Sequence, residues 1–341
     1  MANGDTTASR LGQVNKAGDT DALFLKVFSS EILSTFEEYN VMKDLHTVRT
    51  ISNGKSAQFP VTGIADAKYH TPGQNIADAG NSYLSQIKHA EKVINIDKML
   101  VSSSFIANWD EMVNHYDVRS IYASELGKAL AKRFDLAAMK TLVAGARADS
   151  ALKTAGSDGF DGHDGIQITG ALSATPTADE IVSALFTAAQ RLDENDVPND
   201  GSRFAILKPR DYYTLLKSSD EIINRDFGGV GNVATASLPM AAGFKIYKSQ
   251  HLTDVGVAAG SQEADDDNAL NDVFGGSGTG YNADLSSTEI IGGHPSAIGT
   301  VKLLDLATES EYKIELQGTL FVAKYAMGHG VLRPECAFEI Q

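Results

Sequence analysis

One stretch constrains the fold of this chain more than any other, because apolar residues recur at helical spacing over residues 109–144. The apolar positions are Trp109, Met112, Val113, Tyr116, Ala123, Leu126, Leu130, Phe134 and Ala137. A helix of these 36 residues would be about 54 Å long. The sequence therefore predicts a strut-like helix whose apolar side needs other elements to cover it.

Residues 45–101 instead follow the period-two pattern of strands. Two strands are predicted, and the residues that share a side are Ala57, Phe59 and Val61 in the first and Ile94 and Ile96 in the second. Residues 63–83, which lie between them, are rich in Gly, Ala, Asp and Asn. We interpret this unit as a long β-hairpin with a soft tip and few residues to form a core of its own.

The segment before the hairpin divides into two parts. Residues 1–20 are small and polar and predict a mobile arm. Asp21 is a candidate N-cap for a helix that ends near Tyr39. Its apolar face comprises Leu23, Val27, Ile32 and Phe36.

Residues 177–252 predict a compact α/β unit. Thr177 or Asp179 caps a helix that ends near Asp193. A strand over 203–209, a short helix over 209–217 and a strand over 243–252 follow. Residues 297–341 are strand-rich, and we expect them to close a sheet against the long helix.

Composition narrows the class of protein. With 43% hydrophobic and 21% charged residues, the chain can bury a sizeable core. Its net charge of −15 argues against direct recognition of DNA or RNA, whose phosphates would be repelled. The single cysteine excludes an internal disulfide and a cysteine-based zinc cluster and fits a reducing cytoplasm. We expect neither a signal peptide nor a membrane span.

The negative charge is concentrated in one segment. Residues 249–301 hold eight acidic residues and no lysine or arginine. We interpret residues 255–287 as an exposed insertion, because this much like charge has to stay hydrated. We expect it on the outer face of any assembly that the chain forms.

Candidate chemical motifs are weak. Gly54, Lys55 and Ser56 form the end of a phosphate-binding loop, but Arg49 stands where that motif needs glycine. The motif also needs a strand followed by a helix, whereas two strands are predicted here. Asn53 and Gly54 instead suit a tight turn.

A second candidate is a glycine-broken loop that could hold a hard cation such as calcium through Asp158, Asp161, His163 and Asp164. The spacing does not match the twelve-residue calcium loop, so a solvated loop is the favoured interpretation. A metal-dependent hydrolase that uses Asp158, Asp161 and His163 is kept as an alternative.

No further catalytic, cofactor-binding or metal-ligating residue is predicted. The other histidines are scattered without a zinc motif and are read as structural: His46, His70, His89, His115, His251, His294 and His329. Cys336 follows Pro334 without a histidine nearby in the sequence. GGVGN and GGSGTG miss the dinucleotide fingerprint. His115, Asp117 and Arg119 do not share a helix face.

The predicted shape favours assembly. An arm, a coreless hairpin and a long strut expose edges and apolar surface in a monomer. Neighbouring copies would cover them, and closed assemblies gain strength from many modest contacts.

Six blocks of sequence resemble the major capsid proteins of short-tailed bacteriophages of the coliphage T-seven type. They are ALFLKVF (22–28), VRTISNGKSAQFPV (48–61), HAEKVINID (89–97), MVNHYDVRS (112–120), GTVKLLDLA (299–307) and AKYAMGHGVLRPE (323–335). The blocks occur in family order from near one end of the chain to near the other, except that none matches residues 255–287.

The resemblance implies an α+β fold, the tailed-phage and herpesvirus capsid fold named for phage Hong Kong ninety-seven. It implies five regions: an N-terminal arm (1–44), an extended loop (45–101), a peripheral domain (102–177) with a spine helix (109–144), an axial domain (178–290) and a return to the peripheral domain (291–341).

The resemblance also implies a function without catalysis or cofactors. The chain would form hexamers and pentamers of an icosahedral virion shell around double-stranded DNA, which it would not bind specifically. Its partners would be copies of itself, a scaffolding protein and a portal protein, with assembly in the host cytoplasm and no membrane contact. An encapsulin-type shell is the nearer alternative, and the metal-dependent hydrolase is the alternative of a different class.

Overall fold

The computed structural model divides the chain into two compact units, one of residues 1–40, 100–132 and 306–325 and one of residues 41–99, 133–305 and 326–341. The residues that the structure describes are 32, 34–36, 40–63, 65, 67–77, 83, 87, 89–96, 98–109, 118–150, 163–173, 175–218, 238, 240–253, 281, 283 and 285–341. The predicted arm (1–20) and most of the predicted helix after Asp21 lie outside them.

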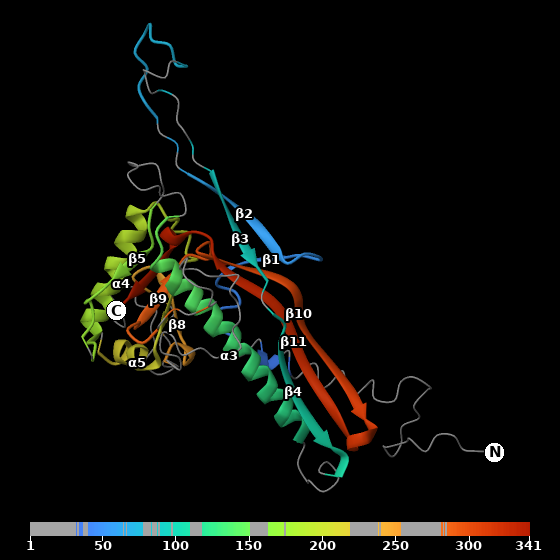
Figure 1. Ribbon diagram of the computed structural model, residues 1–341. Coiled ribbons are helices and arrows are strands. Elements are labelled where there is room, and N and C mark those ends of the chain that lie inside the picture. The colour runs from blue at the N-terminus through green and yellow to red at the C-terminus, as the bar shows by residue number, and fades with distance from the viewer. Residues whose placement is uncertain are drawn as a thin grey trace, which may run out of the picture. The chain divides into compact units, whose positions relative to one another are not determined.

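The first unit is built on long strands. β4 (Leu100–Ala107) pairs antiparallel with β11 (Gly318–Val331), from Ala107 opposite Gly318 to Leu100 opposite Tyr325. β10 (Ile298–Lys313) is the other neighbour of β11, and Figure 1 shows the three strands running side by side. Ile32 and Phe36 are buried, as their predicted helix face requires, and the Phe36 ring meets the Tyr325 ring edge-on.

The long helix forms as predicted over most of its length. α3 spans Val118–Ala146, and residues 110–117 of the predicted strut lie outside the described residues. Ala123, Leu126, Leu130 and Phe134 are buried, whereas Trp109 is 73% exposed. The helical period was therefore right about the buried face within α3 and wrong about Trp109, which lies outside α3 and is mostly exposed.

The second unit holds a six-stranded sheet in the order β5-β12-β9-β6-β8-β7. Its strands are β5 (Ile166–Ile168), β6 (Phe204–Leu207), β7 (Met240–Ala241), β8 (Phe244–Lys248), β9 (Ile290–Gly293) and β12 (Ala337–Ile340). All four residues of β6, of β9 and of β12 are buried. This sheet is therefore the main core of the unit.

Two further helices of this unit confirm the sequence pattern. α4 (Ala178–Glu194) begins at Thr177, whose side chain accepts the Glu180 N–H while the Glu180 carboxylate accepts the Thr177 N–H. Thr177, and not Asp179, is thus the cap, and the pair is a capping box. α5 (Pro209–Ser218) has its proline in the first turn, where a missing N–H costs nothing.

The C-terminal strands pack on the last turns of α3, as expected. A Cβ at Gly145 would lie 3.2 Å from Val331 Cγ1 and 3.5 Å from Ala337 Cβ. Just beyond the helix, Arg147 Nε donates to the buried Glu339 Oε2 at 2.7 Å. This ion pair fastens the helix end to β12.

The predicted hairpin forms from β2 (Ser56–Thr62) and β3 (His89–Asn95), which pair antiparallel from Ser56 opposite Asn95 to Thr62 opposite His89. β1 (Thr47–Thr50) precedes it and pairs in parallel with β10. The base of the hairpin joins a small apolar cluster of Ala57, Ile94, Ile96, Val301 and Ala326. The hairpin is thus anchored at its base, and Figure 1 shows β2 and β3 as a separate two-stranded ribbon.

Two glycines of β11 allow this anchorage. A Cβ at Gly328 would overlap the carbonyl oxygen of Asn95, and a Cβ at Gly330 would lie 2.7 Å from Ile94 Cγ1. The end of β3 can therefore lie directly on β11 only because both positions lack a side chain.

A buried polar network fixes the segment that leads into the hairpin. Asp135 is fully buried, and its carboxylate accepts the Val41 and Met42 N–H groups at 3.0 and 3.1 Å and pairs with His251 Nδ1 at 2.9 Å. His46 Nδ1 lies 2.6 Å from the Met42 carbonyl oxygen.

His329 of β11 lies next to this network. Its Nδ1 lies 2.8 Å from Thr300 Oγ1, and its ring packs against those of His46, Phe134 and Tyr281. Burial lowers the pKa of His329 to about 3, and burial also lowers the pKa of His46. Both rings are therefore held in their neutral form.

The expected exposed insertion over 255–287 is wrong at its C-terminal end. Tyr281, Ala283 and Leu285 are buried, and the Tyr281 hydroxyl accepts the His329 N–H at 2.8 Å. The prediction rested on the acidic composition of the whole segment, which did not reveal that these three apolar residues are buried. Residues 254–280 lie outside the described residues, so the placement of the acidic part stays a prediction.

We predict that Gly328→Ala destabilises the subunit by about 1–3 kcal/mol, the usual cost of overpacking. At an open extended position the same change would stabilise the folded protein by about 0.4–1 kcal/mol, because alanine lowers the conformational entropy of the unfolded chain. The sign of the change in stability therefore shows whether the position is crowded. Chemical denaturation measures it. Gly145→Ala is the control and should be nearly neutral, because helix propensity offsets its milder crowding. Equal effects of the two variants would contradict the proposed close contact.

We predict that the free energy of unfolding falls as the pH decreases below about 6.5. The unfolded chain then protonates His329, whereas the folded chain does so only near pH 3. His329→Asn should lower the stability at neutral pH and flatten this pH dependence, as measured by urea denaturation between pH 8 and pH 5. If the free energy of unfolding of His329→Asn keeps the pH dependence of the wild-type protein, His329 is not the group that causes it.

Candidate functional site

The hairpin exposes the side chains that its base does not bury. Tyr69 is fully exposed, and Ile76, Ile87 and Val93 are 55%, 44% and 42% exposed. Large apolar groups on a narrow two-stranded element have little of their own chain to pack on. The hairpin therefore presents a surface that is suited to contact another molecule.

The hairpin tip, defined here as residues 67–77, contains a hydrogen-bonded turn. Thr71, Pro72, Gly73 and Gln74 form a turn closed by a 3.1 Å bond from the Gln74 N–H to the Thr71 carbonyl oxygen. Proline at the second position and glycine with φ +92° at the third are typical of a type II turn.

Tyr83, from the returning arm of the hairpin, fastens this turn. Its hydroxyl accepts the Thr71 N–H at 2.9 Å and donates to Gln74 Oε1 at 2.5 Å. The bond from Thr71 lowers the pKa of the Tyr83 phenol. His70 Nε2 lies 2.9 Å from the Gln74 carbonyl oxygen, and the His70 and Tyr83 rings are 5.3 Å apart.

The base of the hairpin carries cations. Arg49 Nη1 donates to the Gln58 carbonyl oxygen at 2.8 Å, and its guanidinium lies 5.5 Å from the Phe59 ring centre. Lys92 is the cross-strand partner of Phe59, and burial lowers the pKa of its ammonium. This face is therefore suited to meet an acidic surface.

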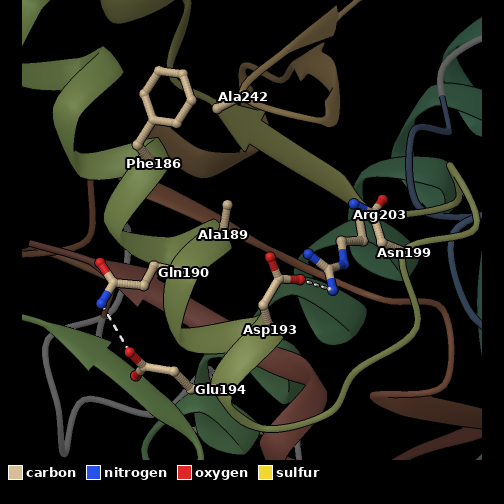
Figure 2. Close-up of a pocket in the computed structure, with 8 residues that line it drawn as sticks. All are labelled: Phe186, Ala189, Gln190, Asp193, Glu194, Asn199, Arg203 and Ala242. Atoms are coloured by element: carbon tan, nitrogen blue, oxygen red, sulfur yellow. Dashed lines mark hydrogen bonds and ion pairs between the residues drawn. The ribbon is translucent and has the colours of Figure 1, made fainter.

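A shallow hollow in the second unit offers a contrasting surface (Figure 2). α4 contributes Phe186, Ala189, Gln190, Asp193 and Glu194 to its lining, and Asn199, Arg203 and Ala242 complete it. Arg203 is nearly buried and donates to Asp193 Oδ1 at 2.7 Å. Phe186 is 60% exposed. The exposed Phe186 ring lies at one end of the hollow and the carboxylates of Asp193 and Glu194 lie toward the other, so the hollow presents both apolar and acidic groups.

The candidate phosphate-binding loop is not one. Gly54 has φ +109°, and Ser56 is the first residue of β2. The Lys55 carbonyl oxygen accepts the Ile96 N–H at 2.7 Å. Two strands flank the segment, as predicted, and Gly54 supplies the bend between them.

The candidate cation loop is only partly described, since Asp158 and Asp161 lie outside the described residues. Asp164 Oδ1 accepts the Ser150 N–H at 2.8 Å. His163 lines a pocket of about 150 Å³ together with Glu335 and Cys336. Among the described residues, no group of three or more His, Cys, Asp and Glu side chains could hold a metal ion.

The structure brings the neighbouring residues His294 and Ser296 together with Asp200 and Cys336, which are far from them in the sequence. The Ser296 hydroxyl donates to Cys336 Sγ at 3.3 Å and lies 2.8 Å from His294 Nδ1. His294 Nε2 lies 3.5 Å from Asp200 Oδ2. Burial raises the pKa of the Cys336 thiol, which keeps it protonated and unreactive. This chain of contacts holds the turn after β9 against the C-terminal segment.

Of the remaining candidates, the structure describes His89 and Arg119. His89 begins β3 and is exposed, and the Arg119 guanidinium lies 5.8 Å from the Phe321 ring centre. His115, Asp117 and the segments GGVGN and GGSGTG fall outside the described residues. In the described part of the chain, no helix is long and apolar enough to cross a membrane.

Comparison with known proteins identifies the family of this chain. A family model described as Gp10A-like, major capsid protein, matches residues 58–341. The major capsid protein of Escherichia phage T7 is 35% identical over 99% of this chain and 97% of its own length. The major capsid protein of Enterobacteria phage T3 is 33% identical over the same shares of the two chains.

A solved structure supports the fold. The capsid structure of cyanophage P-SCSP1u matches with a TM-score of 0.71 and 38% identity over 97% of both chains. The expected tailed-phage capsid fold is thereby confirmed, and neither the encapsulin-type shell nor the metal-dependent hydrolase is favoured. The chain belongs to the Gp10A-like family of major capsid proteins, and it is a structural subunit of a bacteriophage capsid and not an enzyme.

Proposed function

We propose that copies of this chain assemble into hexamers and pentamers of an icosahedral shell, in which the hairpin of each copy lies across a neighbouring copy. The observation that carries this proposal is the contrast within the hairpin. Its base is buried in the cluster around Ile94, whereas Tyr69 and Ile76 toward its tip are fully and half exposed. Contacts of this kind repeat at every subunit, so modest individual energies add up to a stable shell.

The division into regions follows from the same proposal. Residues 45–101 serve as the extended loop, residues 102–177 and 291–341 as the peripheral domain, residues 178–290 as the axial domain and residues 1–44 as the arm. The continuous helix α3 and the anchored hairpin support this division.

The wider role of the shell involves partners of other kinds. We propose that it forms in the host cytoplasm with a scaffolding protein and a portal protein and then encloses double-stranded DNA without binding it specifically. The net charge of −15 supports the last point, because an acidic wall does not grip phosphates.

We predict that the purified chain, together with its scaffolding protein, forms hollow shells, because assembly covers its exposed apolar side chains with neighbouring copies. Sedimentation and electron microscopy measure the outcome. Compact monomers under all conditions, with the scaffolding protein present, would rule out the proposal.

We predict that deletion of residues 65–82 leaves a folded subunit that fails to form stable shells. The described residues of this segment are exposed, so its loss removes little from the core. Thermal unfolding of the unassembled subunit serves as the folding control. Normal assembly of the variant, with shells as heat-resistant as those of the parent, would show that the hairpin does not provide the contact.

A further inference from the structure

Tyr83 is placed to control the shape of the hairpin tip although it lies on the opposite arm of the hairpin. Its hydroxyl makes two hydrogen bonds to one turn, as acceptor from the Thr71 N–H and as donor to Gln74 Oε1. We name the arrangement of His70, Thr71, Gln74 and Tyr83 the tip clasp. A single hydroxyl that joins both sides of a turn restricts its conformations more than either bond alone.

Two large exposed apolar side chains flank the clasp. Tyr69 directly precedes His70 and is fully exposed, and Ile76 follows Gln74 by two residues and is 55% exposed. Asn75 Oδ1 accepts the Ala77 N–H at 3.0 Å, which fixes the backbone around Ile76. The clasp therefore determines how far apart the two side chains stand.

We propose that Tyr83 is a positioning residue that prearranges Tyr69 and Ile76 as a two-point contact for a second copy of this chain. The proposal rests on the proposed function, in which the hairpin lies across a neighbour. Aromatic and apolar anchors dominate protein interfaces, and a contact that is ordered in advance loses less conformational entropy when it forms.

Charge favours a second copy as the occupant. The hairpin region, residues 45–101, holds six basic and four acidic residues, a net charge of +2, which leaves −17 for the rest of the chain. Each hairpin is thus attracted to the other surfaces of a neighbouring copy, and charge complementarity brings such surfaces together in a defined register. The bound chain then covers Tyr69 and Ile76.

Tyr83→Phe isolates the positioning role, because it removes the hydroxyl and keeps the ring that contacts His70. We expect amide hydrogen exchange of residues 70–75 in the unassembled subunit to become several-fold faster. Shells of the variant should dissociate at a lower denaturant concentration than parent shells. Tyr69→Phe is the matched control, because it removes a hydroxyl and keeps the apolar anchor, and it should leave both measurements unchanged.

The double variant Tyr69→Ala with Ile76→Ala separates the anchors from the clasp. It should weaken the shells as Tyr83→Phe does, or more, while the exchange of residues 70–75 stays close to that of the parent. If shells of Tyr83→Phe dissociate at the same denaturant concentration as parent shells, although amide exchange is faster, Tyr83 does not have the positioning role.

Two further outcomes distinguish this inference from the proposed function. Failure of the 65–82 deletion to assemble, together with normal shells of the double variant, would leave the proposed function standing and overturn the inference. The variants could instead weaken only particles that contain other phage proteins, and leave shells of this chain alone unchanged. That result would overturn the assignment of a second copy as the partner that contacts Tyr69 and Ile76.

Discussion

The close approach of the hairpin base to β11 is the contact on which the rest of the architecture depends. Gly328 and Gly330 let Asn95 and Ile94 lie directly on the strand, and apolar side chains then seal the junction. A hairpin without a core is marginal by itself. Fixed at one end, it can present exposed side chains at the other without unfolding.

Burial separates two kinds of side chain in this subunit. Its core holds the sheet around β6 and β12 and the buried polar network around Asp135 and His329. Tyr69 and Ile76 at the hairpin tip are exposed and lie outside that core. Under the proposed function, these exposed apolar side chains contact a neighbouring copy.

Much of the fold could be predicted from the sequence, and the misses share a physical cause. The periods of 3.6 and 2 identify α3 and the hairpin because burial imposes them directly. The burial of Tyr281 and the clasp of Tyr83 could not be predicted, because both depend on partners distant in sequence or across a turn, His329 in one case and Thr71 in the other. The contacts that join Asp200 and Cys336 to His294 and Ser296 could not be predicted for the same reason.

We propose that the hairpin of one copy lies across another copy, and a density map of the assembled shell is the decisive test. We expect Tyr69 and Ile76 of each hairpin to be buried against a neighbouring copy, while Ile94 remains in the cluster of its own subunit. A map in which the hairpin folds back on its own subunit, or in which its tip stays exposed to solvent, would show that the hairpin does not join neighbouring copies.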